Sequence, residues 1–187
     1  MENVRLDPRQ IRVLAHPLRS RLLGSLRLQG PATATRLARE LGTNSGATSY
    51  HLRQLAEVGL VAEQESDGGG RERWWRAVHQ SSSWLRSQYD GDPDAAAAAD
   101  WLENYQIERL TARADEWRAA APVESLEWRD AAGFSDFLLT ISPGRLRELT
   151  DELEAVVERH RAQRPDEQGA RRVHFYLGAM PEPESPS

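Results

Sequence analysis

Arginine is the side chain best suited to chemistry in this sequence, and the chemistry it offers is anion recognition. The chain of 187 residues has 24 basic residues, all of them Arg, and no Cys. Without Cys there is no disulfide, thiolate zinc site or nucleophilic thiol. The guanidinium group binds phosphates and base edges bidentately, so a polyanion is a fitting partner.

Histidines and glycines do not form a catalytic or metal-binding pattern. The five His residues, at positions 16, 51, 79, 160 and 174, show no HxxxH or HxH spacing, which helical metal ligands need. Gly68-Gly69-Gly70 lies between two expected strands, not between a strand and a helix, so it is not a phosphate loop. No GxSxG or HExxH motif is present. We therefore expect no metal, no cofactor and no enzymatic activity.

The charge is divided unevenly along the chain. Residues 1–79 carry 12 Arg and 8 acidic residues, a balance of +4, whereas residues 80–187 carry 12 Arg and 21 acidic residues, a balance of −9. A basic first part suits a polyanion, and the acidic remainder would be repelled by one. No apolar run approaches the length of a membrane span, so we expect a cytoplasmic protein without a membrane contact.

One expected helix places small polar residues and Arg together. It opens after Asn44 or Ser45 and closes at Gly59. At about 100° per residue, one face carries the apolar positions and His51, which we predict to be a packed, hydrogen-bonded core residue. The apolar face comprises Ala47, His51, Leu55 and Val58. The opposite face comprises Ser45, Gly46, Ser49 and Arg53, with Tyr50 at its edge.

Three helices and a hairpin surround this helix in the sequence. Asp7-Pro8 opens a first helix, His16-Pro17 interrupts it, and a second helix ends near Gly30-Pro31. A third helix follows, with apolar residues from Ala34 to Leu41 and a stop at Gly42. Residues 60–65 and 71–78 predict two strands joined by a Gly-rich turn.

This order of elements resembles the ArsR family of winged helix-turn-helix transcriptional regulators. The stretches that carry the resemblance, within about residues 8–79, are "LAHPLRSRLLGSL" at 14–26, "TATRLARELG" at 33–42, "SGATSYHLRQLAEVGLV" at 45–61 and "GRERWWRAV" at 70–78. The resemblance implies a homodimer that binds a two-fold-related operator, usually as a repressor. Relatives that sense metals use Cys in the third helix, which has none here.

The residues themselves fit double-stranded DNA. A helix of this length enters the major groove, and its N-terminal residues reach base edges first. Arg residues beside the hairpin tip and on the third helix suit phosphates. The predicted DNA-binding residues are Ser45, Gly46, Thr48, Ser49, Tyr50, Arg53, Arg36, Arg39, Arg71 and Arg73.

The second part of the chain predicts a mainly helical region with two short strands, which makes the fold class α+β. A long helix from about 94 to 120 changes its apolar side along its length, so it is expected to contact two partners, its own chain and a second subunit. Trp101, Leu102 and Tyr105 are the predicted dimer contacts. Strands are expected at 134–142 and 172–179, on either side of a helix that starts at Ser142-Pro143. They form either a parallel βαβ unit or two separate strands on the long helix.

These features predict four regions and one main function. The regions are a winged helix-turn-helix domain at 1–79, a connector at 80–93, a dimerisation and ligand-sensing region at 94–180, and a disordered tail at 181–187. The expected function is a sequence-specific, homodimeric DNA-binding repressor that a small organic effector releases from a palindromic operator. The alternatives are a protein–protein interaction module and a regulator without a ligand.

Overall fold

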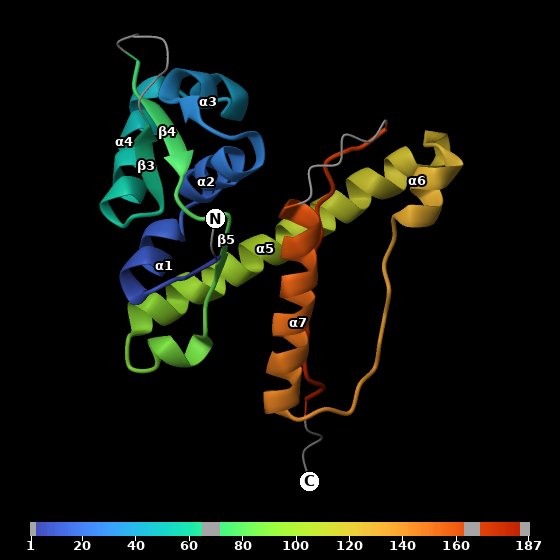
Figure 1. Ribbon diagram of the computed structural model, residues 1–187. Helices are drawn as coiled ribbons and strands as arrows, with labels where there is room; N and C mark the ends of the chain where they lie inside the picture. Colours follow the sequence, from blue (N-terminus) through green and yellow to red (C-terminus); the bar gives the residue numbers. More distant parts are fainter. Residues whose placement is uncertain (1–2, 65–71, 163–168, 184–187) are drawn as a thin grey trace. The chain divides into compact units, whose positions relative to one another are not determined.

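The computed structural model describes residues 3–64, 72–162 and 169–183. The chain divides into two compact units, Met1–Ala112 and Arg113–Ser187, and each is described by itself. The first unit holds the helices and the small sheet at the N-terminal end of the chain (Figure 1).

Four helices of the first unit lie where the sequence predicts them: α1 (Pro8–Leu14), α2 (Pro17–Gln29), α3 (Ala34–Leu41) and α4 (Ser45–Glu57). Each begins after a side chain that accepts a hydrogen bond from a backbone N–H of the first turn: Asp7, His16, Thr33 and Asn44 respectively. These caps satisfy donors that a helix leaves unpaired. Local sequence therefore sets where each helix begins.

A three-stranded antiparallel sheet, in the order β2-β4-β3, completes the predicted winged helix-turn-helix domain. The predicted hairpin is formed by β3 (Val61–Gln64) and β4 (Trp74–Ala77), with Val61 opposite Ala77. The short strand β2 (Ala32–Thr33), which precedes α3, was not predicted. Trp75 is buried and Trp74 is half-buried, as expected for neighbours on opposite faces of a strand.

The first unit extends beyond residue 79. Strand β1 (Asn3–Arg5) pairs in parallel with β5 (Ser81–Ser83), which is followed by the short helix η1 (Arg86–Tyr89). Residues 80–93, the predicted connector, thus contain regular structure. The first half of the long helix α5 (Pro93–Ala120) joins the same core through buried residues. One of these is Leu102, whose side chain is only 4% exposed, and the prediction that it contacts a second subunit is corrected because its own core covers it.

The second unit contains the end of α5, the helices η2 (Ala121–Val123), α6 (Leu126–Ala131) and α7 (Pro143–Ala162), and two extended segments. The predicted α7 is confirmed, whereas the strands predicted at 134–142 and 172–179 are wrong. The backbone there belongs to no strand, and the connection from α6 to α7 runs without regular structure (Figure 1). A strand needs a hydrogen-bonded neighbour, and neither segment has one among the described residues.

A substitution at Tyr89 tests whether its hydrogen bond to Leu6 stabilises the packing of the segment after residue 79 on the first unit. Its buried hydroxyl donates a 2.9 Å hydrogen bond to the Leu6 carbonyl, and burial raises the pKa of this phenol. We expect Tyr89→Phe to lower the free energy of unfolding by about 1–3 kcal/mol, because a buried carbonyl loses its donor. Urea unfolding measures this, with Tyr50→Phe, an exposed hydroxyl, as the control. Equal stability of Tyr89→Phe and the unmodified chain would contradict the assignment.

Candidate nucleic-acid interface

The outer face of α4 is polar and open, as the sequence predicts. Ser45, Gly46 and Arg53 are exposed, and Ser49 is half-buried between them. Tyr50 projects beside them with 56% of its surface exposed. Hydroxyl and backbone groups thus lie along the N-terminal half of α4, where a helix in a major groove reaches base edges, and the Arg53 guanidinium lies about one turn further along the helix.

Thr48 does not share this face, and its predicted DNA contact is corrected. The side chain is fully buried, and its Oγ1 donates a 3.0 Å hydrogen bond to the Asn44 carbonyl. The buried side of α4 is Thr48, Leu52 and Leu55, which recur at spacings of four and three. The buried face is therefore rotated by about one residue from the face predicted through Ala47 and His51.

The start of α4 has little space beside Asn44. The Asn44 Oδ1 accepts a 2.8 Å hydrogen bond from the Ala47 backbone N–H. A Cβ atom built on Gly46 would lie 3.3 Å from that same oxygen, which is closer than a normal contact. Gly46 therefore leaves room for the cap as well as exposing backbone on the outer face.

The preceding helix adds two of the predicted Arg residues. Arg36 and Arg39 are exposed on α3, and Arg36 lies in its first turn. The turn between α3 and α4 begins at Gly42, whose φ of 66° is in the left-handed region that favours glycine. Two helices joined by this tight turn form a helix-turn-helix.

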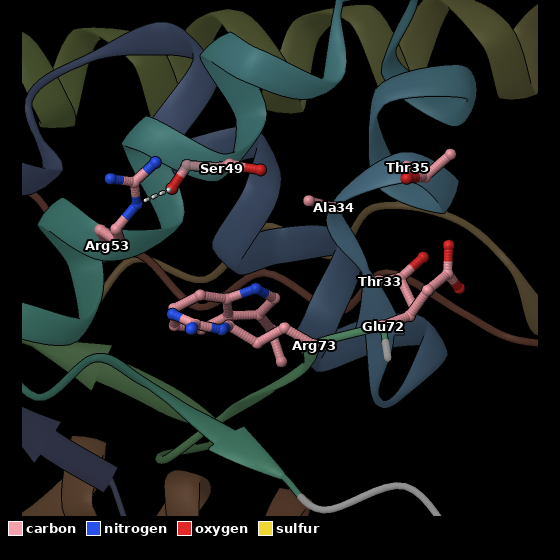
Figure 2. A pocket seen from close by; sticks show the side chains of 8 residues that line it. Thr33, Ala34, Thr35, Ser49, Arg53, Glu72 and Arg73 are labelled. Atoms are coloured by element: carbon pink, nitrogen blue, oxygen red, sulfur yellow. Dashed lines mark hydrogen bonds between the residues drawn. The ribbon is translucent and has the colours of Figure 1, made fainter. Parts of the chain in front are cut away.

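A hollow of about 440 Å³ lies where α4, the start of α3 and the hairpin meet (Figure 2). Its lining residues are Thr33, Ala34, Thr35, Ser49, Arg53, Glu72, Arg73 and Trp75. The Arg53 Nε donates a 3.2 Å hydrogen bond to the Ser49 carbonyl, and Arg73 pairs with Glu63 at 2.8 Å. The structure thus brings together Ser49, Arg53 and Arg73, whereas Arg71 lies outside the described residues.

Thr33 and Thr35 were missed as candidate site residues. Thr33 caps α3 through its Oγ1, which accepts from the Arg36 backbone N–H, and Thr35 is exposed in the first turn. Both residues line the hollow because the unpredicted strand β2 brings this helix start beside β4. The signal available in the sequence was the Thr immediately before the apolar run of α3.

A pair of imidazoles lies behind the outer face of α4. The ring centroids of His16 and His51 are 4.5 Å apart, and the Tyr50 ring meets His51 edge-on at 5.2 Å. His51 is half-buried, and its buried Nδ1 has no hydrogen-bond partner among the described residues, so the predicted hydrogen bond is not seen. Burial lowers the pKa of His51, and the nearby charges of His16 and Arg19 lower it further. Burial and the charge of Arg19 also lower the pKa of His16.

The fold and this face together define a winged helix-turn-helix protein. A helix-turn-helix domain family matches residues 14–64, which span α2, α3, α4 and β3. That match supports a DNA-binding regulator. No curated protein sequence is similar to the chain. Among the described residues, no group of three potential metal ligands occurs, and no helix is long and apolar enough to cross a membrane.

Several solved structures of regulators share a partial likeness with the chain. One, described as a possible transcriptional regulator for arsenical resistance, is 31% identical, with 58% of this chain and 96% of that chain covered and a TM-score of 0.34. A MarR family transcriptional regulator from Silicibacter pomeroyi is 18% identical, with 79% and 73% covered and a TM-score of 0.33. ZitR from Lactococcus lactis is 14% identical, with 76% and 83% covered and a TM-score of 0.33.

The imidazole pair predicts a dependence of stability on pH. Both histidines have lowered pKa values in the folded chain, so the unfolded chain binds protons first as the pH falls through the ordinary value of about 6.5. The free energy of unfolding should therefore be at its full value above that pH and decrease below it. His51→Gln should flatten this decrease. Urea unfolding of the variant and the unmodified chain between about pH 5 and 8 measures the slopes; an unchanged slope in the variant would contradict the assignment.

Proposed function

We propose that this protein is a sequence-specific regulator of transcription that binds double-stranded DNA through α4. The observation that carries the proposal is the polar outer face of α4, beside the Arg-lined hollow and the exposed Arg36 and Arg39. In the bound state α4 lies in the major groove, and Arg53 contacts a base or a phosphate. Arg73, and Arg71 from the sequence, contact the backbone beside the groove.

DNA fits this surface better than a protein partner does. A helix that docks on a protein presents apolar anchors, whereas α4 presents Ser45, Gly46, Ser49 and Arg53. The balance of +4 over residues 1–79 favours a polyanion as well. We infer that this surface binds DNA.

The regulator acts as a homodimer of the ArsR type on a palindromic operator. Two copies of α4 then lie about one helical turn, roughly 34 Å, apart. Trp101 and Tyr105 are the proposed contacts on α5; both are half-buried, and their rings stack with centroids 5.2 Å apart. Repression in the cytoplasm follows the resemblance to the ArsR family, and a small organic molecule is a better candidate effector than a metal ion because the sequence has no Cys and no metal-binding spacing of His.

Selection of duplexes from a random library by the purified chain tests the proposal. Enrichment of a two-fold-symmetric site is the expected result. Binding to the selected duplex should weaken steeply with salt, because neutralised phosphates release counterions. Absence of duplex binding even at low salt would overturn the proposal in favour of the protein-interaction module.

Substitution of Arg53 shows whether this side chain contacts a base or a phosphate. We expect Arg53→Ala to weaken binding to the selected site by roughly 1–3 kcal/mol and to relax the base preference at one position. Arg9→Ala removes the same charge from the exposed surface of α1 and should leave binding nearly unchanged. Fluorescence anisotropy on the selected and a scrambled duplex measures both effects. An equal loss on the two duplexes would make Arg53 a phosphate contact.

Trp101 tests the proposed dimer contact. Replacing it with Glu puts a charge beside Tyr105, so we expect Trp101→Glu to sediment as a monomer, because an interface does not accept an unpaired charge. Gln106→Glu introduces the same group at an exposed position of α5 and should leave the dimer intact. Circular dichroism checks that both variants retain their helices, and a folded dimeric Trp101→Glu variant would contradict the assignment.

A further inference from the structure

The two flanks of α4 contact different parts of the first unit. Ser49 and His51 are two positions apart, so at about 100° per residue their side chains point in nearly opposite directions around the helix. Ser49 lines the hollow beside α3 and the hairpin (Figure 2). His51 lies on the other flank, where its ring meets His16 at the start of α2. The hollow therefore marks one side of the exposed face, and the imidazole pair marks the other.

Arg19, in the first turn of α2, joins the imidazole pair on this second flank. The side chain is half-buried, and its buried Nε has no hydrogen-bond partner among the described residues. After burial, which is the larger cause, the charge of Arg19 lowers the pKa values of His16 and His51. Burial also lowers the pKa of Arg19 itself, whereas the nearby Tyr50 phenol raises it. The guanidinium therefore lies among these three rings.

The cluster of His16, Arg19, Tyr50 and His51, called here the Arg19 cluster, contains no acidic side chain. Helix α2 carries three Arg and no Asp or Glu. No described carboxylate is among the groups that shift the pKa of any of the cluster's two His residues or of Arg19. A cation that is partly withdrawn from water without a counter-ion is stabilised by an anion. The cluster therefore suits an anion from outside the chain.

A helix in the major groove lies close to two phosphate backbones. The groove is about 12 Å wide and an α-helix with its side chains is about 10–12 Å in diameter, so groups at both edges of the helix reach phosphates. On the hollow side, Arg73 is the contact already proposed. On the other side, Tyr50 is exposed at the edge of α4, with Arg19 beside it. Arg and Tyr are both common donors to phosphate oxygens.

We propose that Arg19 and Tyr50 bind one phosphate of the DNA backbone, on the flank of α4 that faces away from the hollow. The guanidinium donates to the phosphate oxygens through its terminal nitrogens, and the Tyr50 hydroxyl donates a further hydrogen bond. This contact rests on the proposed function, which places α4 in the major groove. With phosphates bound on both flanks, α4 is fixed in the groove, so Arg53 is positioned although Arg19 itself reads no base.

The salt dependence of duplex binding tests this contact. Each phosphate neutralised on B-DNA contributes about −0.9 to the slope of log K against log salt. We expect Arg19→Gln to weaken binding about tenfold on the selected and the scrambled duplex alike. The slope should become shallower by about 0.9 for each bound chain. Arg19→Lys keeps the charge and should keep the slope. Fluorescence anisotropy at a series of salt concentrations measures both quantities.

Arg9→Gln is the matched control, because it removes the same group from the exposed surface of α1. This helix contacts the C-terminal end of α4, where the Gln10 side chain donates a 3.0 Å hydrogen bond to the Val58 carbonyl. The control should change neither the affinity nor the slope. Tyr50→Phe should weaken binding about two- to tenfold with an unchanged slope, because the lost hydroxyl carries no charge. Circular dichroism checks that each variant retains its helices.

The imidazoles report on the same site without any substitution. A phosphate beside Arg19 would favour the charged forms of His16 and His51, so both pKa values should be higher with the selected duplex than without it. NMR titration of the imidazole signals of the full chain measures this difference. The measurement keeps the contact testable even where Arg19→Gln does not fold.

Four outcomes would overturn the contact. They are an unchanged slope in a folded Arg19→Gln variant, a loss confined to the selected duplex, a loss of slope in Arg19→Lys equal to that in Arg19→Gln, and imidazole pKa values that the duplex leaves unchanged. A chain that binds no duplex even at low salt would overturn the proposed function and this contact together. Sequence-specific binding with an unchanged slope would overturn the contact alone.

Discussion

The packing of α4 against the core of the first unit is the constraint on which the candidate interface depends. Thr48, Leu52 and Leu55 are fully buried, so rotation of α4 about its axis is fixed. The opposite side of the helix must then face outward, with Arg53 and Tyr50 at set positions. The hydrogen bond from Thr48 Oγ1 to the Asn44 carbonyl lets a polar residue take part in this packing without an unpaired group. The candidate DNA-binding face thus follows from the way the helix is buried.

The sequence predicted the helices of the first unit well because their signals are local. Asp7, Thr33 and Asn44 are cap residues next to apolar residues at helical spacing, and all three cap their helices in the structure. The rotation of α4 was predicted less accurately, since a pattern of apolar residues treats Thr48 as polar and His51 as part of the core. The pairing of β1 with β5 was not predictable, because it joins Asn3 to Ser81 across the whole domain.

In the second unit, local sequence signals predicted a helix correctly but did not predict the strands correctly. The apolar composition of 134–142 and 172–179 is typical of strands, but composition does not supply the neighbour that makes a strand, and the prediction of two strands was wrong. Helix α7 was predicted because its hydrogen bonds are internal to the segment. Helix α7 therefore forms where the two expected strands do not, because a helix finds its hydrogen-bond partners within its own segment and a strand needs a neighbouring strand.

The Arg residues at the hollow already have partners, so DNA binding at this face would exchange interactions. Arg73 pairs with Glu63 while both side chains are more than half exposed, and such surface pairs contribute only about 0–1 kcal/mol. A phosphate that displaced Glu63 would gain a charge-assisted contact and lose little. The released carboxylate would then lie near the DNA and repel it, unless it turned outward toward solvent. Under the proposed function, Glu63 would favour a geometry in which the hairpin contacts the DNA backbone through Arg73 while its acidic side faces away from the DNA.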